Sequence, residues 1–200
     1  MCTVSFIARK KGYLLGMNRD EKRSRPKGLP PSESRIDGHC VTYPSEPNGG
    51  TWISLNDSGA TLALINWHSV ARRVTTDSVS RGEIIPSMNA AESSESVDLV
   101  FPELPLSRIN PFRLIGIFPQ SQEVLEWEWD LSQLVRKAHN WRSQQWISSG
   151  FDEPMAQTIR SETFKQFLTQ RSAGTSDSAA APPCLAHSEM RPVFHLHAPL

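Results

Sequence analysis

The 200-residue sequence has few cysteines, no excess charge and no long hydrophobic run. Its three cysteines, Cys2, Cys40 and Cys184, include no CxxC pair, which argues against a disulfide framework or a zinc ribbon. Lysine plus arginine and aspartate plus glutamate both number 21, so no basic surface for nucleic acid is expected. No apolar run reaches the roughly 18 residues of a membrane span. A basic run from Arg9 interrupts the N-terminal apolar stretch, so we expect a cytoplasmic protein without a secretory signal.

Short apolar segments separated by turns predict a single α+β domain with mostly antiparallel sheets. Residues 2–8 and 13–17 flank a Lys-Lys-Gly turn, and residues 52–55 and 60–66 flank an Asn-Asp-Ser-Gly turn. Both pairs are typical of β-hairpins. The other predicted elements are helices at 80–85 and 91–101, strands at 112–118, 123–129 and 145–149, and a helix from Asp152 to about Arg171.

Three further expectations concern the segments between and after these elements. Residues 22–48 are polar and rich in proline, which favours a long loop. In the strand EVLEWEW, residues 123–129, apolar and acidic residues alternate, so we expect one face in water. Residues 172–183 form a low-complexity linker before a weakly patterned tail at 184–200. The apolar side of the last helix is expected to consist of Met155, Ile159, Phe164, Phe167 and Leu168.

The opening stretch, MCTVSFIARKKGYLLGMNRDE, carries the strongest indication of chemistry. Removal of Met1 would leave Cys2 with both a thiol and a free α-amine, whose reference pKa values are about 8.5 and 7.7–8.0. The amine can then act as the general base for its own side chain. Because the predicted hairpin returns the second strand beside the first, Arg19 can favour the thiolate and Asp20 can orient the amine. A salt-bridged turn is the competing interpretation of these charges.

A cysteine nucleophile also requires donors for an oxyanion and groups that hold the substrate. Asn66 ends the predicted strand ATLALIN and is the candidate amide donor, with Asn18 as a weaker one. Trp52 begins a strand that we expect beside the Cys2 strand, and Ser149 offers a hydroxyl. Asn18, Trp52 and Ser149 are therefore the predicted substrate-binding residues, although strand-end hydrogen bonding would also explain the serine.

No metal site is predicted, because no set of residues has ligand spacing. His39 and Cys40 are adjacent in a polar segment without a partner at that spacing. The tail contains a further group of residues able to bind metal or haem, namely Cys184, His187, His195 and His197. We interpret both groups as ordinary loop or tail residues.

Four ordered motifs add a resemblance: MCTVSF followed by GYLLGMNRDE, then GGTWISLNDSGATLALIN, SRGEIIP and WISSGFDEP. Together they make residues 1–170 similar to the NRDE family, also called the transport and Golgi organization protein 2 family. The resemblance implies an N-terminal-nucleophile (Ntn) hydrolase-like domain at residues 1–171, built as a four-layer αββα sandwich. It also implies catalytic roles for Cys2, Arg19, Asp20 and Asn66. The tail does not fit the closing strand expected of relatives.

Two functions follow from this resemblance. The first is an amidohydrolase-like enzyme that cleaves a non-peptide C–N bond of a linear acyl amide through a thioester on Cys2, without a cofactor. The second is a non-enzymatic protein that binds haem or an acyl ligand such as acyl-CoA, since some family members are linked to haem trafficking and acyl-CoA metabolism.

Overall fold

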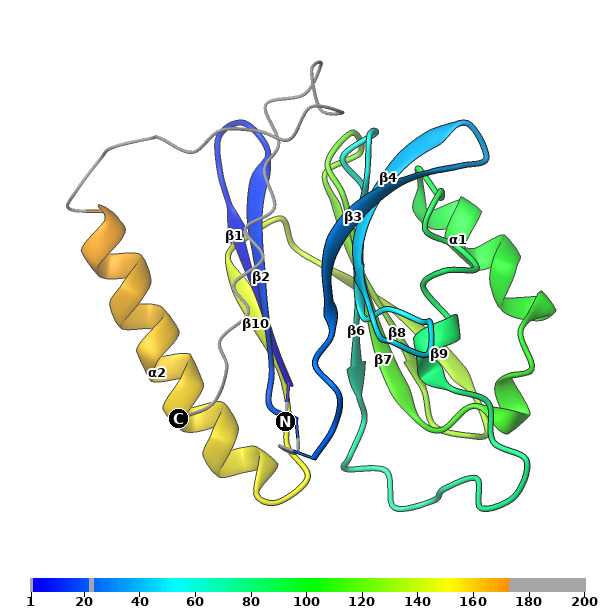
Figure 1. The fold of residues 1–200 in the computed structure, drawn as a ribbon. Helices are drawn as coiled ribbons and strands as arrows, with labels where there is room; N and C mark the ends of the chain where they lie inside the picture. The colour runs from blue at the N-terminus through cyan, green and yellow to red at the C-terminus, as the bar shows by residue number, and fades with distance from the viewer. Residues whose placement is uncertain (1, 22–23, 173–200) are drawn as a thin grey trace.

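The computed structural model describes residues 2–21 and 24–172. In this part of the chain, ten strands form two antiparallel sheets, which two α-helices flank. Figure 1 shows helix α2 (Glu153–Ser172) outside the smaller sheet and helix α1 (Ser94–Val100) outside the larger one. The predicted α+β class and antiparallel sheets are thus confirmed. Apart from Ser172, the predicted linker and tail lie outside the described residues.

The smaller sheet places the N-terminal strand in its centre. Strand β1 (Cys2–Ala8) pairs with β2 (Tyr13–Arg19) on one side and with β10 (Gln144–Ser148) on the other. The predicted first hairpin is therefore present, and its turn uses Gly12 at a φ of +72°, a conformation that glycine adopts without steric cost. Because both edges of β1 are hydrogen-bonded, the position of Cys2 is set by two neighbouring strands.

The larger sheet follows chain order from one edge to the other, so each strand pairs with the next. Its seven strands are β3 (Leu29–Ile36), β4 (His39–Ser45), β5 (Ile53–Asn56), β6 (Thr61–Asn66), β7 (Phe112–Phe118), β8 (Glu123–Trp129) and β9 (Leu134–His139).

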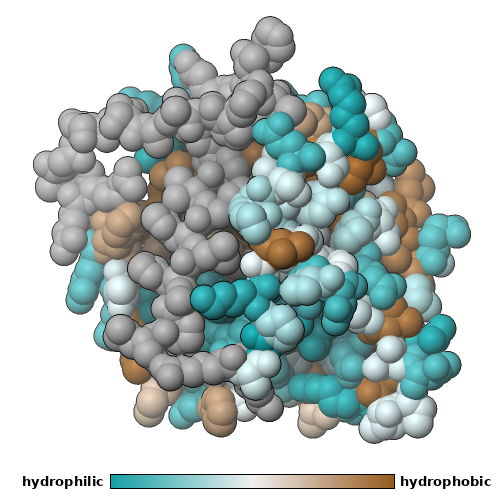
Figure 2. Space-filling view, in the orientation of Figure 1, coloured by the Kyte–Doolittle hydropathy of each residue, from teal (hydrophilic) through white to brown (hydrophobic). Residues whose placement is uncertain are grey.

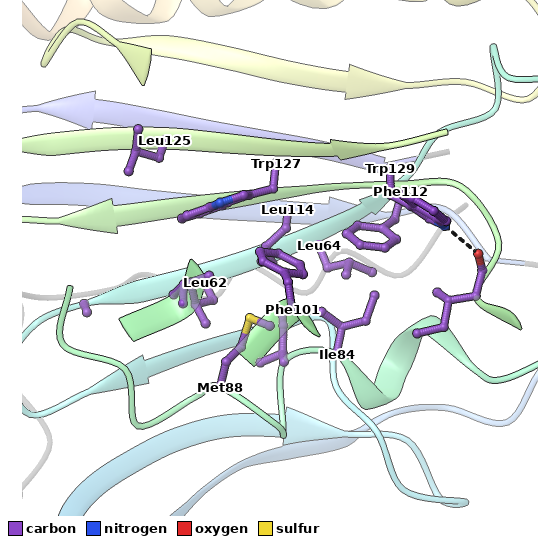
Figure 3. Packing of buried hydrophobic residues seen from close by; sticks show 14 of the residues in the cluster. Leu62, Leu64, Ile84, Met88, Phe101, Phe112, Leu114, Leu125, Trp127 and Trp129 are labelled. Carbon is purple, nitrogen blue, oxygen red and sulfur yellow. Dashed lines mark hydrogen bonds between the residues drawn. The ribbon is translucent and has the colours of Figure 1, made fainter. Parts of the chain in front are cut away.

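Two hydrophobic cores cover the two faces of this larger sheet. On β6, Leu62 and Leu64 pack toward α1, whereas Ala63 and Ile65 pack toward the smaller sheet. This alternation explains the nearly continuous apolar sequence of the central strands, because strands buried on both faces need no polar side. Figure 3 shows the core on the α1 side, where the Trp129 indole N–H donates to the Ile109 carbonyl oxygen at 3.0 Å.

The prediction of a long loop over residues 22–48 is wrong. This segment contains the β3–β4 hairpin, whose turn places Asp37 and Gly38 at φ values of +50° and +87°. Asp-Gly is a strong signal for such a turn, but the high proline content of the segment was interpreted as evidence for a loop. Pro30 and Pro31 lie on the edge strand β3, where a missing N–H is tolerated, and the register shifts beside them.

The remaining element predictions differ from the structure in detail. Strands β7 and β8 have the predicted bounds, but β9 was not predicted. The segment at 80–85 is a single 3₁₀ turn (η1, Arg81–Glu83) capped by the Ser80 side chain, because Pro86 limits any longer helix. Helix α1 is followed by two more 3₁₀ turns, η2 (Phe101–Glu103) and η3 (Leu106–Arg108).

The acidic face of β8 is not in water, contrary to the prediction. Glu126 is 2% exposed and points toward the smaller sheet. Its carboxylate contacts Arg113 Nε at 2.5 Å, His139 Nε2 at 2.8 Å and Trp146 Nε1 at 3.2 Å. Arg113 also donates to the carbonyl oxygen of Ile147 on β10. The alternation of apolar and acidic residues in β8 was interpreted as a solvated face because the partners of Glu126 lie on other strands.

Helix α2 begins as predicted, because the Asp152 carboxylate accepts a hydrogen bond from the Met155 amide at 2.9 Å. The predicted apolar side is only partly right, since Met155 and Ile159 are 60% and 57% exposed, whereas Phe164 and Leu168 lie on the less exposed side. That side also includes Arg160, whose guanidinium donates to Thr3 Oγ1. The outer face of the smaller sheet likewise combines polar and apolar side chains, since the paired residues Thr3 and Ile147 both lie on it.

Hydrophobic and hydrophilic residues are mixed over the visible described surface in Figure 2. Neither of the two α-helices in the described residues is long and apolar enough to cross a membrane.

Replacing Glu126 tests whether the network between the sheets stabilises the fold. We expect Glu126→Gln to lower the free energy of unfolding by about 3 kcal/mol, because it leaves partly buried cations without their carboxylate. Urea denaturation of the variant and wild type measures this difference. Glu162→Gln, on an exposed position of α2, is the control and should change it by less than about 0.5 kcal/mol.

The same network predicts a pH dependence. Burial alone would raise the pKa of Glu126, but the contacts with His139 and Arg113 lower it below its ordinary value. The stabilisation should be complete above about pH 4.3, the reference pKa of an unfolded glutamate. It should be lost as the pH falls through the folded-state pKa, so wild type and Glu126→Gln should converge in acid.

Candidate functional site

Cys2 lies at one end of the space between the two sheets. Its Cα partners are Arg19 on β2 and Ser148 on β10, and its side chain belongs to the core between the sheets. Directly paired residues share a face of the sheet. The structure therefore brings the predicted nucleophile and Arg19 together, and adds Ser148, the neighbour of the predicted Ser149.

Arg19 is held by an aromatic ring and two carboxylates. Its guanidinium carbon lies 4.0 Å from the centre of the Trp52 ring. Its Nη2 contacts Glu21 at 2.6 Å and Glu46 at 3.0 Å, and Arg25 pairs with the same two carboxylates. Trp52 is therefore a platform for Arg19, and much of the positive charge of Arg19 is compensated.

Burial dominates the electrostatics of the Cys2 thiol. The side chain is buried, which raises the pKa of the thiol above its ordinary value, while Arg19 acts in the opposite direction. Glu21 and Asp20 add to the increase. The thiol in this setting is protonated at neutral pH, so a nucleophilic thiolate requires a nearby base.

Asn66 reaches the same end of the molecule from the larger sheet. Ser148, which faces Cys2 across the β1–β10 pair, donates its hydroxyl hydrogen to the backbone oxygen of Asn66. The side-chain amide of Asn66 has no hydrogen-bond partner among the described residues. Asn66 pairs with Phe112 and alternates with Ile65, however, so its side chain lies on the α1 side of β6, and it is the Asn66 backbone that meets the β1–β10 pair.

Two of the remaining predicted residues lie elsewhere, and Asp20 pairs with helix α2. Strand alternation places Asn18 on the opposite face from Cys2, and Asn18 is exposed. Ser149 is buried and accepts a hydrogen bond from the Phe151 amide at 3.3 Å. Asp20 forms an ion pair with Arg160 of helix α2 at 2.9 Å. These contacts make the Asp20–Arg160 pair a link between α2 and the end of β2.

Two glycine motifs that are distant in sequence meet beside Trp52. The Thr51 amide donates to the Gly82 carbonyl oxygen at 3.0 Å. Gly50 has a φ of +82°, and a β-carbon there would lie 3.0 Å from that same oxygen. The GGTW and SRG motifs thus form one packed unit, and this contact fixes the backbone on both sides of Arg81.

Arg81 is a second arginine at this end, and the sequence analysis noted its motif without giving it a role. Its Nη1 donates to the Pro111 carbonyl oxygen at 3.0 Å, and the Trp67 amide, one residue after Asn66, donates to the same oxygen at 3.2 Å. A thiolate at Cys2 would lie close enough to raise the pKa of Arg81, although burial lowers that pKa overall. No group of three or more His, Cys, Asp or Glu side chains suited to a metal ion occurs among residues 2–21 and 24–172.

This architecture is similar to solved Ntn hydrolases. The C2A variant of conjugated bile acid hydrolase from Clostridium perfringens aligns with a TM-score of 0.52 and 11% identity, covering 82% of this chain and 57% of that one. Penicillin V acylase from Agrobacterium tumefaciens aligns at 0.47 and 11%, covering 88% and 60%. The chain thus spans less than two thirds of the length of either structure. The fold is Ntn-hydrolase-like.

The sequence itself identifies the family. Residues 1–128 match the Transport and Golgi organisation 2 family, and the chain belongs to that family, as its motifs predicted. No curated protein matches the chain in sequence.

The contact between the two glycine motifs gives a matched pair of variants. Gly49→Ala and Gly50→Ala both place a side chain at positive φ, but only at Gly50 would the new β-carbon meet the Gly82 backbone. We expect Gly49→Ala to cost about 1–2 kcal/mol of folding free energy from backbone strain alone. Gly50→Ala should cost roughly 1–3 kcal/mol more because of the clash. Equal urea midpoints for the two variants would contradict this contact.

Removing the charge of Arg19 should make the Cys2 thiol harder to ionise. Arg19→Met should raise the pKa of the thiol and slow alkylation by iodoacetamide at pH 8 by roughly threefold to tenfold. The measurement is the alkylation rate of the Cys2 peptide from pH 6 to 10, followed by mass spectrometry. Arg142→Met, at an exposed position between β9 and β10, should leave the profile unchanged.

Proposed function

We propose that this protein is an N-terminal cysteine hydrolase acting on the C–N bond of a small acyl amide. The observation that carries the proposal is the position of Cys2 in the middle strand of the smaller sheet, between Arg19 and Ser148, whose hydroxyl bonds the backbone oxygen of Asn66. The Ntn-hydrolase-like fold and the family membership support it.

The first chemical step requires a base, because burial raises the pKa of the Cys2 thiol. After removal of Met1, the α-amine of Cys2 accepts the thiol proton, and the resulting thiolate attacks the carbonyl carbon of the amide. Arg19 lies on the same face and favours the thiolate. The compensation of Arg19 by Glu21 and Glu46 keeps its guanidinium over Trp52, so that it tunes the thiol from a fixed position.

The second step breaks the C–N bond. The carbonyl oxygen becomes an oxyanion, for which Asn66, at the end of β6, is the proposed hydrogen-bond donor. The protonated α-amine then gives its proton to the leaving nitrogen, and the acyl group remains on Cys2 as a thioester. Water, deprotonated by the same amine, attacks the thioester and releases the carboxylic acid.

Asp20 contributes indirectly in this scheme. Its ion pair with Arg160 ties the end of β2 to helix α2, and Arg160 also bonds Thr3, the residue after Cys2. We therefore give Asp20 and Arg160 a positioning role for the N-terminal residue.

The test follows acyl transfer to Cys2 and release of the amine. Purified protein, shown by mass spectrometry to begin at Cys2, is incubated with N-acyl amides of increasing chain length. We expect a covalent acyl adduct on the N-terminal peptide and release of amine. Cys2→Ala should abolish both, and Cys2→Ser should reduce turnover by at least about 10²-fold, because an alcohol is a weaker nucleophile than a thiolate.

Arg142→Gln, at an exposed position between β9 and β10, is the control and should retain turnover. Circular dichroism of each variant establishes that it is folded. Turnover by Cys2→Ala equal to that of wild type would refute the proposed mechanism. A Soret shift on haem titration without any acyl adduct would favour a carrier of haem over a hydrolase.

A further inference from the structure

Arg81 differs from the other substantially buried arginines in having no acidic partner. Arg19 and Arg113, whose side chains are each 16% exposed, both contact carboxylates. Arg81 is also partly buried, yet its hydrogen bond is to the Pro111 carbonyl oxygen, and no carboxylate of the described residues lies within ion-pair distance. Burying a guanidinium without a counter-ion costs free energy. An anion that binds Arg81 would offset this cost.

The position of Arg81 indicates where that anion would lie. Pro111 immediately precedes β7, and its carbonyl oxygen is shared by Arg81 and by Trp67, the residue after Asn66. The hydroxyl of Ser148 joins Asn66 to the strand beside Cys2. Three hydrogen bonds therefore connect Arg81 to Ser148, the residue paired with the proposed nucleophile, and Arg81 and Cys2 interact electrostatically.

None of the described groups around Arg81 supplies a carboxylate for it. A β-carbon added at Gly150, just after β10, would lie 3.6 Å from the His68 ring, and burial together with nearby cations, including Arg81 and Arg73, lowers the pKa of His68. His68 is therefore neutral near pH 7. Arg73 is exposed and turns its guanidinium toward the backbone oxygens of His68, Val70 and Arg72. Glu153, the nearby acidic group, is bonded to Ser69 at 2.8 Å.

We propose that Arg81 binds the carboxylate of an anionic ligand placed beside Cys2, so that the acyl compound acted on here carries a free acid group. The proposal rests on the proposed function only for Cys2 as the reacting group. With Nη1 bound to Pro111, the Nε and Nη2 edge of Arg81 remains for two parallel hydrogen bonds, which suit a carboxylate.

The experiment compares two alkylating reagents of similar size, iodoacetate and iodoacetamide, on the Cys2 thiol. Any change in the thiol pKa alters both rates alike, so the ratio of the two rates reports the local preference for a carboxylate. We expect this ratio in the folded protein to exceed that of a free peptide with the sequence CTVSFIAR by about tenfold. Rates are measured on the Cys2 peptide by mass spectrometry.

Variants assign the preference to Arg81. Arg81→Gln retains a donor for Pro111 but removes the charge, and it should lower the iodoacetate-to-iodoacetamide ratio to that of the peptide. Arg81→Lys should keep an intermediate ratio, and the distant Arg142→Gln should keep the wild-type ratio. If Arg81→Gln fails to fold, the comparison of wild type with Arg81→Lys and with the free peptide still decides the matter.

Sodium acetate and inorganic phosphate then distinguish the two kinds of anion. At equal ionic strength, acetate should protect Cys2 from iodoacetate in wild type and not in Arg81→Gln. An unchanged ratio in Arg81→Gln, or a wild-type ratio no higher than that of the peptide, would overturn the proposal. Stronger protection by phosphate than by acetate would overturn the choice of a carboxylate. Because alkylation needs no turnover, failure here is separate from failure of the proposed hydrolysis.

Discussion

The register of strand β1 is the constraint on which the site depends. Cys2 faces Arg19 on one side and Ser148 on the other, and both pairings are backbone hydrogen-bonded ladders. A shift of one residue would turn Thr3 inward and Cys2 toward helix α2, because side chains alternate across a strand. The buried Val4 and Phe6 oppose that shift, since it would also expose them. Packing of the inner core thus fixes the chemistry at the end of the strand.

The space between the sheets contains both an apolar core and a charged network. Glu126 and Arg113 come from the larger sheet, and Trp146 and the carbonyl oxygen of Ile147 come from the smaller one. Buried ion pairs contribute little net stability compared with apolar packing, but they tolerate few geometries. The network therefore complements the hydrophobic core by specifying how one sheet lies on the other, which decides where Asn66 meets the β1–β10 pair.

Local patterns predicted the β1–β2 and β5–β6 hairpins, because each has a turn signal between apolar segments. The β1–β2 hairpin alone brings Arg19 to Cys2, whereas Asn66 reaches them only because the two sheets pack on each other. The errors came from interactions that are distant in sequence. The polar β3 was mistaken for a loop because it is an edge strand, and the buried face of β8 was mistaken for a solvated one because Arg113 and His139 lie on neighbouring strands.

Arg19 and Arg81 differ in whether a carboxylate lies beside them, and we infer from this difference that they have different roles. Arg19 stacks on Trp52 and shares Glu21 and Glu46 with Arg25, so its charge is balanced before any ligand arrives. A balanced cation can bias an adjacent thiol but has little net attraction for an incoming anion. Arg81 has only a carbonyl oxygen as its described partner. Its backbone is held by the contact between two glycine motifs, so an unbalanced charge is kept in a fixed place. A site with one balanced and one unbalanced arginine separates activation of the nucleophile from recognition of the ligand.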